Sequence, residues 1–184
     1  MYYLTSIALV ASLVLPGAAL AAGGGGSAPP KPTETTTKCK KTEVWDKKAK
    51  KCVEAEEGAE TGQLDNDTLF GAARELAYAG RPDDALVVLG AMTEGESDRV
   101  LTYKGFSYRK AGQFREGLHY YQLALEQNPD NILARSYLGQ AYVEQKALDL
   151  ALAQLDEIVG RGGSGTWAEQ SLRQAIETGQ TYNY

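Results

Sequence analysis

Hydrophobic and polar positions in the second half of the chain follow a helical period, and the helical pattern itself recurs. From Asn66 onward, apolar residues return at the i, i+3, i+4 spacing of an amphipathic helix. The pattern Tyr-x-Gly-x-x-Tyr at residues 103–108 recurs at residues 137–142, an offset of roughly 34 residues. A helix–turn–helix unit of this length cannot bury its apolar face alone. The pattern therefore predicts an all-α solenoid of stacked helix pairs.

Three helix pairs and one further helix fit this pattern over residues 66–178. We place the units at about 66–97, 98–131 and 132–163, the last helix at 166–178, and a tail at 179–184. Gly80 and Gly112 are expected to end the first helix of their units, because a left-handed cap costs glycine little. Asp130 is expected to cap the start of the third pair. The last helix is polar on most sides and is expected to cover the apolar end of the array.

Small, aromatic and proline positions within the units carry a family resemblance. The clearest unit has Leu101, Gly105, Tyr108, Gly117, Tyr121, Ala124 and Pro129; the next has Leu138, Gly139, Tyr142, Ala151, Leu155 and Ile158; the weaker first unit has Leu69, Ala73, Leu76, Ala85, Leu89 and Met92. This spacing resembles the signature of the tetratricopeptide repeat. The resemblance implies a short helical-hairpin solenoid with a C-terminal capping helix, which binds a protein or peptide.

In that family the partner binds on the concave face formed by the first helix of each pair. The corresponding positions here are Phe70, Arg74, Arg99, Thr102, Tyr103, Phe106, Arg109, Leu133, Ser136, Tyr137 and Gln140. Arginines among aromatic rings suit an acidic peptide, because guanidinium groups bind carboxylates with two parallel hydrogen bonds. The alternative is that these arginines only keep the surface soluble. The family's clamp for two carboxylates needs Lys and Asn where this chain has aromatic residues and Arg74, so that mode is not expected.

The N-terminal segment has the pattern of an export signal. An apolar run from Leu4 to Leu15 is followed by Pro16-Gly17 and by Ala19 and Ala21 at small-x-small spacing. No Lys or Arg precedes the run, so the pattern is incomplete. We expect residues 1–21 to be a signal peptide that directs the chain to the periplasm or cell envelope, or to the medium. By analogy with the family, we expect a bacterial protein of the exported type. An uncleaved helix on a membrane surface is the alternative.

Between this segment and the repeats lie a linker and a pair of cysteines. Residues 22–37 are rich in Gly, Pro and Thr and are expected to be disordered. In an exported chain Cys39 and Cys52 suggest a disulfide, and residues 38–54 a small hairpin that turns at Asp46–Lys48. Residues 55–65 are expected to be an acidic linker. The hairpin is expected to be separable from the repeats; the alternative is two cysteines in a disordered tether.

Charge and chemistry exclude several function classes. The formal net charge of −5 argues against a nucleic-acid partner. His119 is the one histidine, and the sequence has neither a phosphate-binding loop nor a metal-ligand motif. We therefore expect no enzymatic activity, no cofactor, no metal and no small-molecule substrate. Seven lysines lie within residues 38–51 against two acidic residues. They are most simply solvated charge, and weak contact with an anionic envelope surface is the alternative.

The sequence predicts a non-enzymatic adaptor or scaffold of the cell envelope, which binds a protein or peptide in the concave groove. The alternative is a module that binds an envelope polymer through the basic Cys39–Cys52 hairpin, with the repeats as support. Deleting residues 22–60 is expected to separate the two, since the adaptor would still capture its partner whereas the polymer-binding module would lose its association with the envelope.

Overall fold

The computed structural model describes residues 28–181. The expected signal peptide, the start of the linker and residues 182–184 lie outside the described residues. Between residues 28 and 181 no helix is long and apolar enough to cross a membrane.

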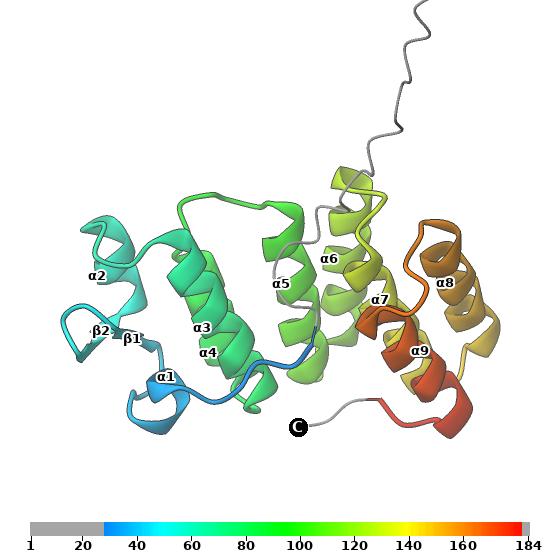
Figure 1. Ribbon diagram of the computed structural model, residues 1–184, viewed down its shortest axis with the longest axis horizontal. Helices are drawn as coiled ribbons and strands as arrows, with labels where there is room; N and C mark the ends of the chain where they lie inside the picture. The colour runs from blue at the N-terminus through cyan, green and yellow to red at the C-terminus, as the bar shows by residue number, and fades with distance from the viewer. Residues whose placement is uncertain (1–27, 182–184) are drawn as a thin grey trace, which may run out of the picture.

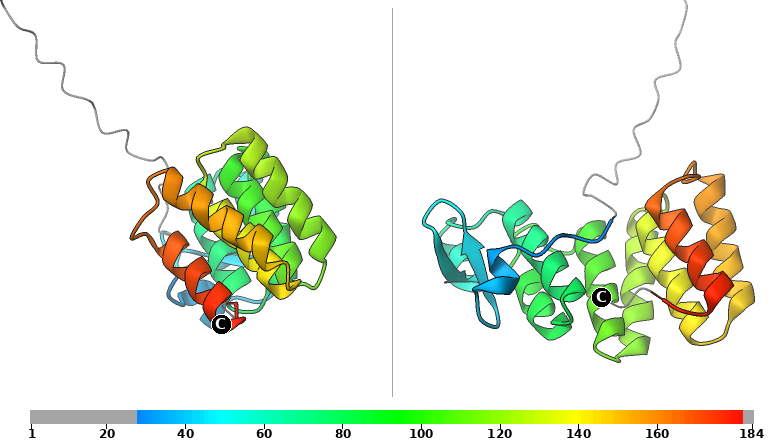
Figure 2. Two further views of the ribbon diagram at one scale, coloured as in Figure 1. Left: turned by 90° about the vertical axis from the view of Figure 1, so that its right-hand side faces the viewer. Right: turned by 60° about the horizontal axis from the view of Figure 1, so that its bottom comes forward.

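Three antiparallel helix pairs and a last helix form the array (Figure 1). The pairs are α3 (Asn66–Tyr78) with α4 (Pro82–Gly90), α5 (Asp98–Lys110) with α6 (Phe114–Gln127), and α7 (Ile132–Glu144) with α8 (Leu148–Gly160). The last helix, α9 (Trp167–Thr178), packs against both α7 and α8. Figure 2 shows the pairs stacked along the length of the molecule. The predicted all-α helical-hairpin solenoid with a capping helix is confirmed.

Polar caps set the helix boundaries. Asp65, Ser97 and Thr166 accept backbone N–H bonds in the first turns of α3, α5 and α9. The expectation for Asp130 was wrong by one residue: the Asn131 side chain accepts the N–H of Ala134 and caps α7. The Asp130 carboxylate is engaged elsewhere, in an ion pair with Arg161.

The two helices of the second pair approach closely at Gly105. A Cβ atom at this position would lie 2.6 Å from Cδ1 of Tyr121 and 3.0 Å from the carbonyl oxygen of Gly117. Tyr121 is fully buried. Any side chain at residue 105 therefore pushes α5 and α6 apart, which explains the small residue in this position of the repeat.

The cysteine segment forms the predicted hairpin. Strands β1 (Glu43–Asp46) and β2 (Lys51–Glu54) pair antiparallel, with Val44 opposite Val53. The disulfide Cys39–Cys52 is present, so this prediction is confirmed and the alternative of two cysteines in a disordered tether is wrong.

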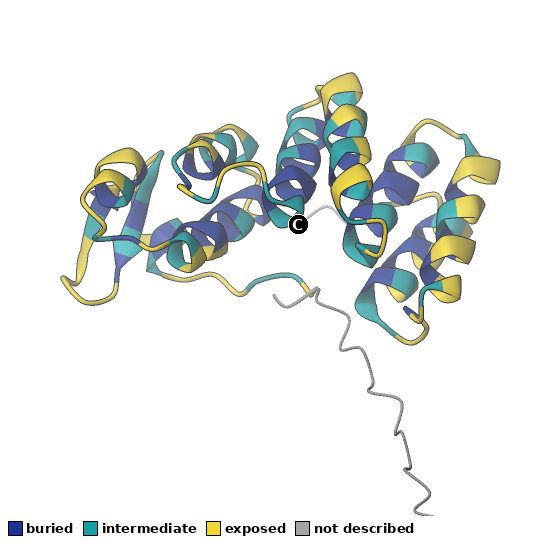
Figure 3. Cartoon of the chain, turned by 90° about the horizontal axis from the view of Figure 1, so that it is seen from above, coloured by how far each residue is buried: buried dark blue, intermediate teal, exposed yellow. Residues whose placement is uncertain are grey.

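The segments beside the hairpin differ from the sequence prediction. The expected disordered linker contains α1 (Glu34–Thr37), and the expected acidic linker contains α2 (Ala55–Glu60). The reason is burial. Val44, Val53, Ala55 and Leu64 share one hydrophobic core with α3, α4 and α5, so this segment packs on the first pair. Figure 3 shows buried residues continuing from the repeats into the hairpin. The hairpin is not separable, because it caps the N-terminal end of the array.

Substituting Gly105 by Ala should lower the free energy of unfolding by about 2 kcal/mol, because the new methyl group overlaps Tyr121. Gly71 is the matched control, since it is exposed in the middle of α3 and a Cβ there meets nothing within 4 Å. Gly71→Ala should raise the free energy by about 0.5–1 kcal/mol through helix propensity. Denaturant unfolding measures both changes, and equal effects of the two substitutions would contradict the packing argument.

Replacing Cys39 and Cys52 by Ser should destabilise the whole array rather than the hairpin alone. The bond closes a loop with a sequence separation of 13, and loss of such a crosslink costs about 3 kcal/mol in the chain-entropy model. Because the hairpin shares its core with α3, the midpoint of helical unfolding should fall. Thermal unfolding followed by circular dichroism tests this, and an unchanged helical midpoint would show that the hairpin is independent.

Candidate functional site: the inner face of the repeat array

The helix pairs are arranged in an arc, with the first helix of each pair on the inner side. Figure 3 views the arc from above, with residues 28–33 crossing its hollow side. Figure 2 shows the same segment running from α1 along α3 towards α5. The inner face is the surface on which the sequence analysis placed its eleven candidate residues.

The aromatic candidates form a buried cluster. Phe70, Tyr103, Phe106 and Tyr137 are each at most 8% exposed. Their rings contact one another, with Tyr103 edge-on to Phe70 at 5.3 Å and Phe106 tilted against Tyr137 at 4.8 Å between centroids. Tyr78, which the sequence analysis did not select, lies 2.5 Å from the Tyr137 hydroxyl, oxygen to oxygen. Burial raises the pKa of Tyr137 well above its ordinary value. These rings belong to the core beneath the inner face.

The three arginines do not form one shared cationic surface. Arg99 lies between Glu94 and Asp67 and covers the ring of Phe70. The side chain of Arg109 is 1% exposed, and its Nη1 lies 2.5 Å from Oε1 of Glu144. Arg109 is therefore a buried structural ion pair rather than a contact for a partner. The chain's own carboxylates already engage two of the three guanidinium groups.

Arg74 is different because it binds main chain. Its Nε donates to the Tyr103 hydroxyl at 2.9 Å, and its Nη2 donates to the carbonyl oxygen of Ala28 at 3.0 Å. Tyr103 thus positions the guanidinium group towards the segment that crosses the inner face.

The candidates from α7 are covered by α9. Ser136 and Gln140 are at most 1% exposed and lie within hydrogen-bond distance of the Ser171 hydroxyl of α9, at 3.0 and 3.4 Å. Gly139 allows this contact, since a Cβ there would lie 2.6 Å from Leu172. Leu133 is half-buried against the core. The expectation that Ser136 and Gln140 face a partner was wrong, because the capping helix covers both residues.

Thr102 has a structural role as well. Its hydroxyl donates to the carbonyl oxygen of Asp98 at 2.7 Å and accepts from the Asn131 side chain at 3.0 Å. The residue ties the start of α5 to the cap of α7 and is 1% exposed.

A cleft of about 440 Å³ remains at the α3 end of the inner face. Residues 30–35, the hairpin and α3 line it; on the hairpin and helix sides the lining includes Trp45, Lys47, Asp67, Gly71 and Arg74. Cations and carboxylates are mixed around this cleft, and one tryptophan ring is available to contact a ligand.

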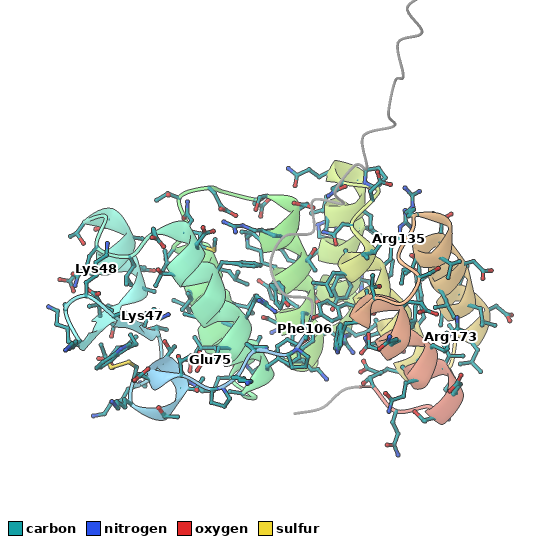
Figure 4. All side chains as sticks on the ribbon, viewed as in Figure 1. Lys47, Lys48, Glu75, Phe106, Arg135 and Arg173 are labelled. Carbon is teal, nitrogen blue, oxygen red and sulfur yellow. A yellow bond between two sulfur atoms is a disulfide. The ribbon has the colours of Figure 1, made fainter. Side chains whose placement is uncertain are left out.

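Glu75 lies beside the cleft and is the residue that the sequence analysis missed. It is 5% exposed, and within the described part of the chain it has no ion pair. Its carboxylate accepts from the backbone N–H and hydroxyl of Thr33, both at 2.6 Å, and from the backbone N–H and hydroxyl of Thr36 at 3.2 and 2.5 Å. Figure 4 shows Glu75 next to the crossing segment. The sequence indicates the burial of Glu75 only through its neighbours in α3, which are the apolar residues Ala72, Ala73, Leu76 and Ala77.

Lys110 adds a half-buried cation at the far end of α5. Its Nζ lies 5.6 Å from the centre of the Phe106 ring, which Figure 4 labels. Burial, together with the neighbouring Arg109, lowers the pKa of Lys110 to about 8. No three His, Cys, Asp or Glu side chains within residues 28–181 are grouped so that they would hold a metal ion.

Substituting Arg109 by Ala should lower the free energy of unfolding by about 3 kcal/mol, because it removes a buried side chain that contacts Phe106 and deprives Glu144 of its ion-pair partner. Arg109→Met keeps the packing and should cost less, and the double variant with Glu144→Gln should be less destabilised than the sum of the single variants. Denaturant unfolding of this cycle measures the coupling. A loss below about 1 kcal/mol for Arg109→Ala would indicate an exposed residue.

Comparison with known proteins agrees with this architecture. Residues 104–166 match the tetratricopeptide repeat family, from the middle of α5 to the turn before α9. No curated protein and no solved structure matches the chain. The matched region contains most of the second helix pair and all of the third, and the first pair repeats their arrangement. Residues 104–166 are therefore a region of tetratricopeptide repeats.

Proposed function

We propose that this protein is a non-enzymatic adaptor of the cell envelope that binds an extended segment of a partner protein on the inner face of α3. Tetratricopeptide repeats generally mediate protein–protein interactions. The observation that carries the proposal is that this face already holds an extended segment by its main chain, through Arg74 and Glu75. When a protein binds an extended segment, main-chain hydrogen bonds supply affinity and side-chain contacts supply specificity.

The choice of the α3 face follows from the coverage of the other inner helices. Because α9 covers α7 and the aromatic rings are buried, the cleft beside α3 offers the accessible part of the inner surface. Arg99 and Arg109 are paired with the chain's own carboxylates, so an acidic partner is no longer favoured. We propose recognition of backbone groups together with contact to Trp45.

The envelope location is supported by two independent features. The N-terminal pattern is that of an export signal. The Cys39–Cys52 disulfide persists in oxidising compartments such as the periplasm and is rare in the cytosol.

One observation favours a second function. All seven lysines of the hairpin segment are exposed, and Lys47 and Lys48 lie at its outer end (Figure 4). An anionic envelope polymer would be attracted to this surface. Deletion of residues 22–60 does not test this function cleanly, because it also removes the N-terminal cap of the array.

Point variants separate the two functions. Gly71→Trp should fill the cleft without touching the core, because the Gly71 position opens into free space. Capture of a partner from envelope extract by the full chain should fall at least tenfold, whereas Gly71→Ala should retain it. Mass spectrometry of the captured material identifies the partner.

Replacing Lys47, Lys48, Lys50 and Lys51 by Gln is the opposing variant and should change capture less than twofold. If the lysine variant loses envelope association while Gly71→Trp keeps it, the polymer-binding function is correct and the adaptor proposal is wrong. Thermal unfolding of each variant shows that the array is intact.

A further inference from the structure

Residues 28–37, which we call the strap, occupy the face on which the proposed partner binds. We propose that the inner face of α3 is a site for an extended, proline-containing segment that ends in a Thr-x-x-Thr turn. The strap is its internal occupant, and a partner segment of the same chemistry binds by displacing it. This inference rests on the proposed function and specifies the class of partner.

Glu75 recognises the turn through hydrogen bonds. A buried carboxylate is costly unless hydrogen-bond donors surround it. All of the donors that the structure gives Glu75 come from Thr33 and Thr36, three positions apart, each through its backbone N–H and its hydroxyl. Ser or Thr at both positions would supply this set, whereas Ala would remove both hydroxyls. Glu75 therefore selects a hydroxyl-bearing turn.

Arg74 binds the extended part of the strap. It binds the carbonyl oxygen of Ala28, five residues before the turn. Pro29, Pro30 and Pro32 lie between the two contacts, and proline favours an extended backbone with no internal hydrogen bonds. An extended backbone presents its carbonyl oxygens to Arg74 without losing intramolecular bonds. Adjacent residues of α3 thus fix the two ends of the bound segment.

The strap is tied to the protein at one end. Thr35 is 4% exposed, and its hydroxyl accepts from the N–H of Trp45, so the turn is fixed to the hairpin as well as to α3. A segment attached by a short connection has an effective concentration of about the millimolar range. A free segment of equal chemistry therefore competes poorly until the contacts of the strap are weakened. The site is hidden in the resting protein.

A synthetic peptide with the sequence of residues 28–38 tests the site. It is labelled with fluorescein and titrated by anisotropy into the full chain, the Thr33→Ala/Thr36→Ala variant, and this variant with Glu75→Gln. The double variant should bind the peptide at least tenfold more tightly than the unmodified chain. Adding Glu75→Gln should reverse that gain. A peptide with Ala at both threonine positions is the matched control and should not bind.

Thermal unfolding confirms that the variants are folded. The inference would be overturned if the peptide bound the unmodified chain and the double variant with equal affinity. It would also be overturned if adding Glu75→Gln left the affinity of the double variant unchanged. If the peptide fails while Gly71→Trp still abolishes capture, the proposed function stands and the strap is only structural. The unmodified chain could also have twice the monomer mass in solution. If Glu75→Gln restores the monomer mass, a second copy of the chain is the occupant, and the assignment to a different partner is overturned.

Discussion

The need to cover both ends of a three-unit array determines the rest of this structure. Each helix pair buries one apolar face on the next pair, so the first and last pairs each have a face without a neighbour. At the C-terminal end, α9 places Leu172 against Gly139 and covers α7. At the N-terminal end, Val44, Val53 and Leu64 complete the core of the first pair. The disulfide reinforces the N-terminal cap.

The caps also decide where a partner can bind. A longer array would expose the first helices of all its pairs on the concave side. Here α9 takes the inner surface of α7, and the aromatic residues between α3 and α7 form a continuous core. The binding surface is thereby moved to α3, beside the hairpin that serves as the N-terminal cap. Stability and recognition share the same elements, so removal of the hairpin affects both.

The sequence predicted the repeats well because their information is local. The close approach at Gly105 and the left-handed glycines after α3 and α5, Gly80 and Gly112, each follow from contacts or backbone geometry within one unit. The disulfide was predictable from two cysteines in a chain whose N-terminal sequence has the pattern of an export signal. The packing of the hairpin on the repeats was not predictable from the sequence. Ala55 and Leu64 are single apolar residues within acidic or polar stretches, and their burial depends on α3.

The site was harder to predict for the same reason. The family positions were located correctly on the inner helices, but the pairing of Arg109 with Glu144 and the cover over Gln140 depend on contacts between units. Proline and threonine composition suggested disorder for residues 28–37. Composition reflects what a segment can bury by itself, whereas residues 28–37 are held by hydrogen bonds to the buried carboxylate of Glu75 on α3.

Native-state hydrogen exchange of the full chain tests the central claim most directly, since that claim joins the two caps and the helix pairs into one cooperative unit. The backbone amides of β1, α3 and α5 should exchange with the same free energy of opening, equal to that of global unfolding. If the hairpin amides instead open at a much lower free energy while α3 keeps full protection, the hairpin is an appendage and the array does not depend on it as a cap.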